Sequence, residues 1–245
     1  MIDYLWPGGP RFAQHPGVFK LGTDSVMLAY FAQSVNETKQ LRTADLGCGA
    51  GVLSIILAWN HPNMNVDAID ISEDAAALAA ENAKLNNLES QINIFHGDIR
   101  EYKEHFSAGA YDTVISNPPY YAPGSGKLPQ DDRMMSARAE RQCTLEDICL
   151  AAGYLARWGG SLFLVHKPER LSDIFRSMNL NGFEPKRLRF VQHRAASAPN
   201  LVLVEGRRGG KASINIEPPL ILTCDDGRDS DEVKLIYKRG GNRDE

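Results

Sequence analysis

Apolar runs of strand length alternate with helical patterns along most of this chain. Such alternation is typical of a mostly parallel sheet with helices on both of its faces. The apolar runs predict strands at residues 42–46, 66–70, 92–95, 111–116, 161–166, 188–192 and 201–205. The helical patterns predict helices at residues 26–31, 52–59, 73–85, 145–158 and 168–178. The expected fold is therefore α/β, with a seven-stranded, mostly parallel sheet.

Polar residues mark where two of these helices should begin. Ser72 can cap the helix after the second strand, with Glu73 and Asp74 in its positive first turn. Thr144 and Asp147 have the spacing of a capping box, with aspartate in place of the usual glutamate or glutamine. The two glycines at residues 159–160 predict the end of that helix near residue 158.

A glycine-rich loop follows the first strand. The strand ends at Asp45-Leu46, and glycines follow at Gly47, Gly49 and Gly51. Glycines after a strand let the backbone turn tightly and approach a ligand without a Cβ clash. A dinucleotide fingerprint needs a glycine where this chain has Val52, and no Gly-Lys-Ser/Thr follows for a P-loop. The loop, including Asp45, therefore favours S-adenosylmethionine over NAD as the cofactor.

Two acidic residues stand at the ends of the next two predicted strands. Asp70 lies 19 residues after Gly51, where a carboxylate can accept hydrogen bonds from ribose hydroxyls. Asp98 follows the third strand, where it can bond the amino group of the cofactor's adenine. Each aspartate alone reads equally well as a turn or cap residue, but together with the loop they predict a cofactor site. The neighbouring Ile71 and Ile99 are assigned to the same site.

The segment Thr23-Asp24-Ser25 leads into the first predicted helix. One interpretation is that Thr23 or Asp24 caps this helix. The other places both residues in the cofactor site, with Asp24 near the ammonium group of the methionine part. Without the rest of the pattern, the segment favours the cap.

The fourth strand ends in Asn117-Pro118-Pro119-Tyr120, which predicts a place for a planar amino group. An exocyclic amine is a weak nucleophile because its lone pair is delocalised into the ring. The Asn117 side-chain oxygen and the Pro118 carbonyl can accept its two N–H groups, and the prolines stiffen the turn. Tyr120 can stack on the target base, which contributes about 1–3 kcal/mol in comparable contacts. Catalysis then depends on position and on acceptors for developing positive charge, with Asn117 also at the edge of the cofactor site.

Together these motifs resemble those of class I S-adenosylmethionine-dependent methyltransferases that modify amino groups. Residues 19–29, 137–140, 201–205 and 218–220 extend the match to the bacterial tRNA1(Val) (adenine-37-N6)-methyltransferase family. The resemblance implies a Rossmann-like class I methyltransferase fold and methyl transfer to N6 of adenosine 37, beside the anticodon of a valine tRNA. It implies that residues 117–120 are catalytic. It also implies that the cofactor contacts include Asp24, Asp45, Gly47, Asp70 and Asp98.

Basic residues give two candidate surfaces for RNA. Seven of them lie between Lys186 and Lys211, with only Glu205 of opposite charge in that stretch. A cluster of this kind can follow phosphates, although a basic run can equally be a solvated face. The long polar segment at residues 122–141 has further basic residues near the catalytic motif, which are candidates for positioning a flipped base. The predicted RNA contacts are Lys127, Arg133, Arg138, Arg141, Arg187, Arg189 and Arg194.

Length, charge and cysteine usage narrow the function classes. The 245 residues, 43% of them hydrophobic, predict one domain over residues 1–245, with residues 1–30 as a lid and a frayed tail at residues 240–245. A net charge of −4 gives no global nucleic-acid signal, so any RNA contact must be local. The four cysteines form no C-x-x-C pair and the histidines are scattered, so no metal site is expected. Without a signal-peptide pattern, a membrane-length apolar run or a coiled-coil seam, we expect a cytoplasmic monomer.

Several functions fit parts of this pattern. An RNA adenine N6-methyltransferase fits best, and a protein glutamine N5-methyltransferase or an rRNA guanine N2-methyltransferase presents similar geometry to its substrate. An NAD oxidoreductase is disfavoured by Val52 and by the lack of a clear acid for hydride transfer. A non-catalytic module that binds S-adenosylmethionine or RNA has no need of the turn at residues 117–120.

Overall fold

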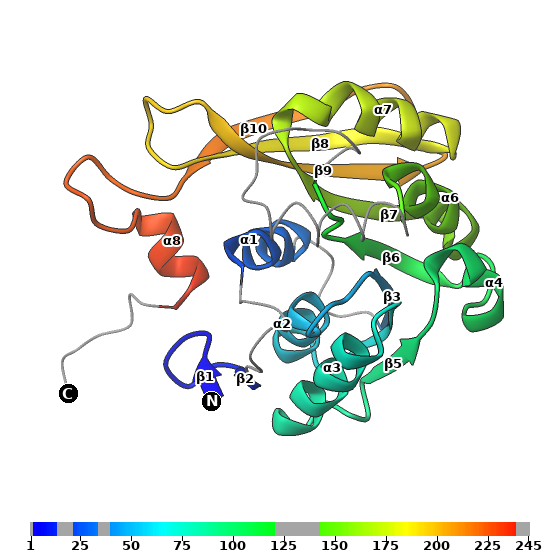
Figure 1. Cartoon of the computed structure of the whole chain (residues 1–245). Helices are drawn as coiled ribbons and strands as arrows, with labels where there is room; N and C mark the ends of the chain where they lie inside the picture. The colour runs from blue at the N-terminus through cyan, green and yellow to red at the C-terminus, as the bar shows by residue number, and fades with distance from the viewer. Residues whose placement is uncertain (1, 14–21, 34–39, 121–142, 239–245) are drawn as a thin grey trace, which may run out of the picture.

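The protein is an α/β structure built on one large mixed sheet, seen in a computed structural model that describes residues 2–13, 22–33, 40–120 and 143–238 (Figure 1). The sheet has eight strands in the order β10-β8-β9-β7-β6-β3-β4-β5. All neighbouring pairs are parallel except those of β9, which is antiparallel to β7 and β8. The strands are β3 (Leu41–Leu46), β4 (Met64–Asp70), β5 (Ile92–His96), β6 (Tyr111–Ser116), β7 (Ala156–His166), β8 (Phe183–Gln192), β9 (Pro199–Arg208) and β10 (Asn215–Ile221).

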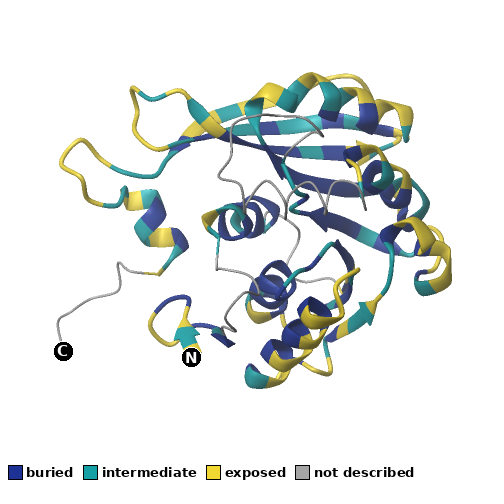
Figure 2. Cartoon of the chain, viewed as in Figure 1, coloured by how far each residue is buried: buried dark blue, intermediate teal, exposed yellow. Residues whose placement is uncertain are grey.

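Helices pack on both faces of this sheet, and each face has its own apolar core. One core joins the sheet to α1 (Thr23–Ala32), α2 (Val52–Asn60), α3 (Glu73–Leu85) and α8 (Asp231–Ile236). The other core joins it to α4 (Tyr102–His105), α6 (Leu145–Leu155), α7 (Leu171–Leu180) and the 3-10 turn η1 (Ile99–Glu101). A second 3-10 turn, η2 (Pro168–Arg170), precedes α7, and a small hairpin of β1 (Ile2–Tyr4) and β2 (Arg11–Ala13) lies outside the main sheet. The central strands are buried on both sides, as Figure 2 shows in dark blue.

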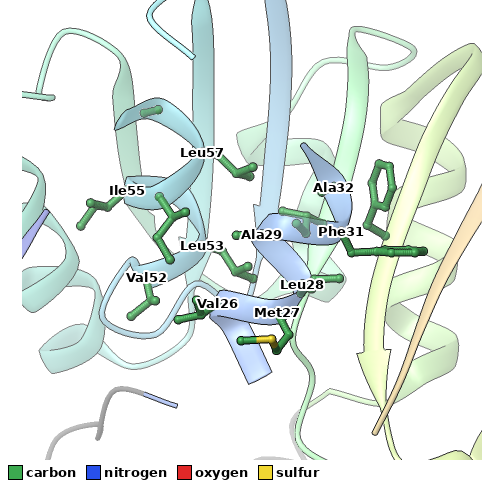
Figure 3. Close-up of a cluster of buried hydrophobic side chains, with 14 of the residues drawn as sticks. Val26, Met27, Leu28, Ala29, Phe31, Ala32, Val52, Leu53, Ile55 and Leu57 are labelled. Atoms are coloured by element: carbon green, nitrogen blue, oxygen red, sulfur yellow. The ribbon is translucent and has the colours of Figure 1, made fainter. Parts of the chain in front are cut away.

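Helix α1 is buried almost all around, which is unusual for a helix of a small α/β protein. Its apolar side chains meet those of α2 on one side, and Phe31 reaches towards the strands (Figure 3). The Phe31 ring meets the Phe163 ring of β7 edge-on, at a centroid distance of 6.0 Å. This packing fixes the position of the α1 amino end, which carries Asp24 and Ser25.

The helix starts predicted from polar residues are confirmed. The Ser72 side chain accepts a hydrogen bond from the Ala75 N–H and caps α3. Thr144 and Asp147 form a reciprocal capping box at the start of α6. These local signals are reliable because each is completed within one turn of helix.

The predicted number of seven strands is wrong, because β10 adds an eighth. This strand contains Pro218 and Pro219, and its register against β8 shifts between Glu217 and Leu220. Proline lacks the N–H that a ladder needs, so a strand with two prolines is tolerated at a sheet edge, where β10 lies. The predicted end of α6 near residue 158 is also wrong, since β7 begins at Ala156.

The glycines at residues 159–160 belong to a strand and not to a helix end. The pairing of β6 with β7 shifts register between Tyr111 and Thr113, opposite these glycines. A Cβ on Gly160 would lie 3.1 Å from the carbonyl oxygens of Tyr111 and Asp112. The glycine pair therefore permits a close backbone approach at a strand irregularity.

Candidate cofactor pocket and catalytic turn

A pocket of about 140 Å³ opens where the carboxyl ends of β3, β4 and β6 meet. The chain crosses from β3 to β4 on one side and later returns to β6 on the other, so this is the switch point at which α/β sheets bind ligands. The pocket holds most of the predicted cofactor residues together with part of the predicted catalytic turn. Its lining consists of Leu46, Gly47, Asp70, Ile71, Asp98, Ile99, Ser116, Asn117, Pro118, Pro119, Cys143 and Ile148.

The glycine loop takes a backbone path that side chains disfavour. Gly47, Gly49 and Gly51 have φ angles of 78°, 55° and 79°. A Cβ on Gly51 would also lie only 3.1 Å from the Ala79 Cβ of α3, so this glycine lets α2 start close to α3. A Cβ on Gly47 would meet only the Ile99 Cδ1, at an ordinary contact distance of 3.8 Å, so glycine is favoured there by the left-handed backbone alone.

Asp70 is held in place by two backbone N–H groups. Gly49 donates to its Oδ2 at 2.8 Å, and Ser72 donates to its Oδ1 at 2.9 Å. The carboxylate thus connects the glycine loop to the start of α3. Each oxygen keeps a further lone pair, so the group can still accept hydrogen bonds from two vicinal hydroxyls.

Asp98 has a basic partner at the rim of the pocket. Its Oδ1 caps η1 by accepting from the Arg100 N–H at 2.9 Å, and its carboxylate pairs with the Arg100 guanidinium at 2.5 Å. The hydrogen bonds from Arg100 lower the pKa of Asp98. The carboxylate is therefore ionised at neutral pH and is available as an acceptor for an amino group.

Asp45 lies behind the glycine loop and does not line the pocket. Its side chain is fully buried, and Oδ2 accepts from the Ser54 hydroxyl of α2 at 2.7 Å. Oδ1 has no hydrogen-bond partner among the described residues. Burial is the main reason that the pKa of Asp45 rises to about 7. The predicted direct contact of Asp45 with the cofactor stays a prediction, and its visible contact is to α2.

We expect Asp45 to make stability depend on pH. Because its pKa is about 7 in the fold and 3.8 in the unfolded chain, the folded state holds the proton more tightly. The contribution of this group is fully present below about pH 4 and is lost as pH rises towards 7. The free energy of unfolding of wild type, measured with urea, should therefore fall relative to that of Asp45→Asn as the pH rises from 5 to 8. If the difference in free energy of unfolding between the two proteins stays constant over this range, Asp45 does not have the raised pKa.

The turn predicted to be catalytic is hydrogen-bonded to the amino end of α1. The Asn117 Nδ2 donates to the Ser25 Oγ at 2.9 Å, and the Tyr120 hydroxyl lies 2.7 Å from the Asn117 Oδ1. The same hydroxyl lies 2.6 Å from the Asp24 Oδ2. It has one proton for two acceptors, so it donates to one of them at a time. The interpretation of Thr23 or Asp24 as a helix cap is wrong, because Gly22 is the N-cap and no side chain bonds there.

The Tyr120 ring has neighbours from the carboxyl end of β7. It lies 5.4 Å from the His166 ring, and the Lys167 Nζ lies 5.1 Å from its centroid. Burial, with the charges of Arg170 and Lys167, lowers the pKa of His166 to about 4, so this imidazole is neutral. Lys167 thus lies over the ring on which a base was predicted to stack.

We expect Tyr120→Phe to separate the two roles of Tyr120. The variant keeps the ring but loses the hydroxyl between Asp24 and Asn117, so the rate constant kcat should fall about 10-fold, the effect of about 1.4 kcal/mol. The KM for the predicted RNA substrate should change little, because the ring remains. Tyr120→Ala removes both and should also raise KM. Equal kinetics for the phenylalanine variant and wild type would show that the hydroxyl has no part in the reaction.

Comparison with known proteins identifies the family. The family model of the methyltransferase small domain matches residues 9–172. The chain belongs to the methyltransferase small-domain family. Enzymes of this family transfer a methyl group from S-adenosylmethionine, which is therefore the cofactor of this methyltransferase.

Curated relatives of the methyltransferase share a name. The tRNA1(Val) (adenine(37)-N6)-methyltransferase of Proteus mirabilis (strain HI4320) is 34% identical over 64% of this chain, and the chain spans 60% of that relative's length. The protein of the same name from Tolumonas auensis is 32% identical over 87% of this chain and 86% of its own length.

Solved structures agree on the fold. The "predicted O-methyltransferase" Atu636 of Agrobacterium tumefaciens superposes with a TM-score of 0.71 at 19% identity, over 88% of this chain and 96% of its own. TrmN of Thermus thermophilus superposes with a TM-score of 0.54 at 22% identity, over 75% of this chain and 48% of its own. The expected Rossmann-like class I methyltransferase fold is thus confirmed, with eight strands in the sheet.

Two of the arginines predicted to contact RNA have ion-pair partners within the methyltransferase fold. Arg187 pairs with Glu205 at 2.9 Å and with Glu217 at 3.2 Å, and also donates to the Phe31 carbonyl at 2.6 Å. Arg189 forms a bidentate salt bridge with Glu232 of α8, in which its two terminal guanidinium nitrogens donate to the carboxylate oxygens at 2.6 and 2.7 Å. RNA contact by either arginine stays a prediction, and the structure speaks against it, because acidic residues neutralise both side chains, which are only 18% and 13% exposed.

We expect Arg189→Ala to lower stability and leave tRNA affinity unchanged. Its loss leaves Glu232 without its two charged hydrogen bonds and frees α8 from β8, at about 1–3 kcal/mol in the free energy of unfolding. Thermal unfolding and tRNA titration at one temperature below both transitions check this. Arg194→Ala, at an exposed position, is the matched control and should keep stability within about 0.5 kcal/mol. A stable Arg189→Ala protein with weakened tRNA binding would restore the original prediction.

Of the other five predicted RNA contacts, one lies among the described residues and four do not. Arg194 is exposed in the turn between β8 and β9 and remains a candidate. The other four lie outside the described residues, as does the whole segment at residues 122–141 that was expected to position a flipped base; they are Lys127, Arg133, Arg138 and Arg141.

Sequence reasoning missed several residues that the fold brings to the site. The Ser25 hydroxyl accepts a hydrogen bond from Asn117, and the Ser116 hydroxyl donates to the Leu46 carbonyl at 2.6 Å, which joins the ends of β6 and β3. Cys143 and Ile148 close the pocket from the α6 side. The one signal for Ser25 was its place beside Asp24; nothing local marks the others.

Two further features bear on function. No helix among the described residues is long and apolar enough to cross a membrane. In the same part of the chain, no group of three or more histidine, cysteine, aspartate or glutamate side chains is placed to hold a metal ion.

Proposed function

We propose that this methyltransferase methylates N6 of adenine in tRNA, with adenosine 37 of tRNA1(Val) as the target, and acts as a cytoplasmic monomer. The observation that carries the proposal is the turn Asn117-Pro118-Pro119-Tyr120 at the rim of the pocket that holds Asp70 and Asp98. The shared name of the relatives from Proteus mirabilis and Tolumonas auensis supports this choice of substrate.

The residues present suit S-adenosylmethionine. The loop glycines allow close backbone approach, and Asp70 is oriented by the Gly49 and Ser72 N–H groups to accept two ribose hydroxyls. Asp98, ionised beside Arg100, is the acceptor for the adenine amino group, and Ile71 and Ile99 supply apolar contact. Asp24 faces the catalytic turn and is the counter-ion for the ammonium of the methionine part.

The catalytic turn supplies two acceptors to the substrate amine. The cofactor, when bound, presents an electrophilic methyl group on its sulfonium sulfur. Asn117 Oδ1 has two lone pairs, one of which faces the Tyr120 hydroxyl, and the other can accept an N–H of the amine. The Pro118 carbonyl is the second acceptor, and a proline-stiffened turn keeps both in place. As the amine nitrogen gains positive charge, these acceptors stabilise it, and its proton leaves after the new bond has formed.

Asp24 and Ser25 determine how Asn117 presents its amide. With Nδ2 bonded to the Ser25 Oγ, the oxygen is on the side of Tyr120. If the cofactor ammonium takes Asp24, the single Tyr120 proton is left for Asn117. The acceptor would then be oriented only in the protein that holds its cofactor.

The deciding experiment is methyl transfer from labelled S-adenosylmethionine to total bacterial tRNA, followed by nucleoside analysis. Labelled N6-methyladenosine is the expected product, and sorting by tRNA species should place it in tRNA1(Val). Label in N2-methylguanosine of rRNA, or in glutamine of a protein, would replace this substrate with one of the two alternatives. If the protein binds the cofactor but transfers no methyl group to tRNA, rRNA or protein, it is a non-catalytic binding module.

A further inference from the structure

The carboxyl edge of the sheet divides into two halves at the catalytic turn. The cofactor pocket uses the ends of β3, β4 and β6. On the other side, in spatial order, lie β7, β9 and β8, with β10 beyond them at the edge of the sheet. At a strand spacing of about 4.8 Å, the end of β7 is one strand from the turn and the end of β8 is about 14 Å away. The second half is thus a surface about two nucleotides wide, directly next to the proposed target base.

The charges on this second half can be counted residue by residue. Arg170 is paired with Asp173 at 2.8 Å, and the earlier candidates Arg187 and Arg189 are neutralised within the sheet. His166 is buried and neutral. Among the described residues at the ends of β7 and β8, two cations are not neutralised in this way, Lys167 at the end of β7 and Arg194 in the turn after β8.

Lys167 is well placed to bind an anion. Its Nζ is 3.4 Å from the Asn200 carbonyl and lies over the Tyr120 ring, and no carboxylate of the described residues is within ion-pair distance. Both contacts are weak ones for an ammonium group. Its flexible stem lets it exchange them for a phosphate oxygen when a base approaches Tyr120.

We propose that Lys167 and Arg194 form a phosphate-binding track for single-stranded RNA, which begins beside the target nucleotide and runs across the ends of β7 and β8. The inference rests on the proposed function, since it takes the substrate to be RNA. Base contacts are not required of either residue, so the track sets position and affinity and leaves the choice of base to the catalytic turn.

The test is tRNA affinity as a function of salt for Lys167→Gln, Arg194→Gln and the double variant. Each single change should weaken binding about 3- to 10-fold at low salt and reduce the slope of log K against log salt by about 0.7, the single-strand value for one phosphate. The double variant should lose about twice as much slope. Affinity for S-adenosylmethionine should stay within 2-fold.

Lys84→Gln is the matched control. It removes the same charge from an exposed position at the end of α3, which starts after β4 at the catalytic edge and runs back to the opposite edge of the sheet. Its affinity and salt slope should equal those of wild type. If Lys84→Gln and Lys167→Gln lose equal tRNA affinity and salt slope, net charge alone explains the effect and the track is overturned.

The two hypotheses fail in different ways. If wild type binds and methylates tRNA but Lys167→Gln and Arg194→Gln leave the salt slope of tRNA binding unchanged, the track is overturned and the proposed function stands. Wild type that neither binds nor methylates tRNA would overturn both.

Discussion

Asn117→Ala should lose methyl transfer about 100- to 1,000-fold while it keeps its affinity for S-adenosylmethionine. The substitution removes the proposed side-chain acceptor for the developing positive charge, and loss of one such preorganised group typically has an effect of this size. It also releases Ser25 and the Tyr120 hydroxyl from their partner. The cofactor pocket retains Gly47, Asp70 and Asp98, so binding measured by calorimetry should change less than 3-fold.

Ser25→Ala provides the graded control for this result. It keeps the Asn117 side chain but removes the hydroxyl that holds its Nδ2, so kcat should fall about 10-fold and Ser25→Thr should restore part of it. Asn117→Ala with undiminished turnover would remove Asn117 from the mechanism. Loss of cofactor binding in the same variant would instead mean that the turn is a structural wall of the pocket.

Asp70→Ala should abolish tight cofactor binding. Its carboxylate accepts from the Gly49 and Ser72 N–H groups and, in the proposed complex, from two ribose hydroxyls. The loss of charged hydrogen bonds of about 1.5–3 kcal/mol each corresponds to a Kd at least 10- to 100-fold higher. The glycine loop also loses the bond that connects it to α3.

Titration with S-adenosylhomocysteine as well as with the cofactor gives a control for Asp70→Ala. Both carry the same ribose, so both should weaken by the same factor. A change of binding for only one of them would place Asp70 near the sulfur and not near the ribose. Retained affinity for both would remove Asp70 from the site.

The parts of this fold that sequence predicts are those completed by near neighbours. The cap at Ser72, the capping box at Thr144 and the positive φ angles of the loop glycines all depend on a few adjacent residues. Asp70 and Asp98 were placed correctly at one pocket because parallel strands end at a common edge.

The parts that sequence misses depend on partners distant along the chain. Arg187 and Arg189 read as an open basic run because Glu217 and Glu232 come after it and belong to β10 and α8. Ser25 meets Asn117 across 92 positions, which no local pattern can show. The strand β10 was missed because its two prolines suit only an edge, and edge position is a property of the finished sheet.

The docking of α1 has a consequence for the order in which this enzyme matures during synthesis. The helix leaves the ribosome early and can pack on the nearby α2, yet its carboxyl-terminal part is completed only by Phe163 of β7 and by Arg187 of β8, which donates to Phe31 across 156 positions. Contacts of such high sequence separation form late in folding. A nascent chain can thus assemble its glycine loop and Asp70 while Asp24 and Ser25 are still unplaced, and it gains an oriented Asn117 only when β8 has emerged. Premature termination before residue 187 would then yield fragments with much of the cofactor pocket but without an organised catalytic turn.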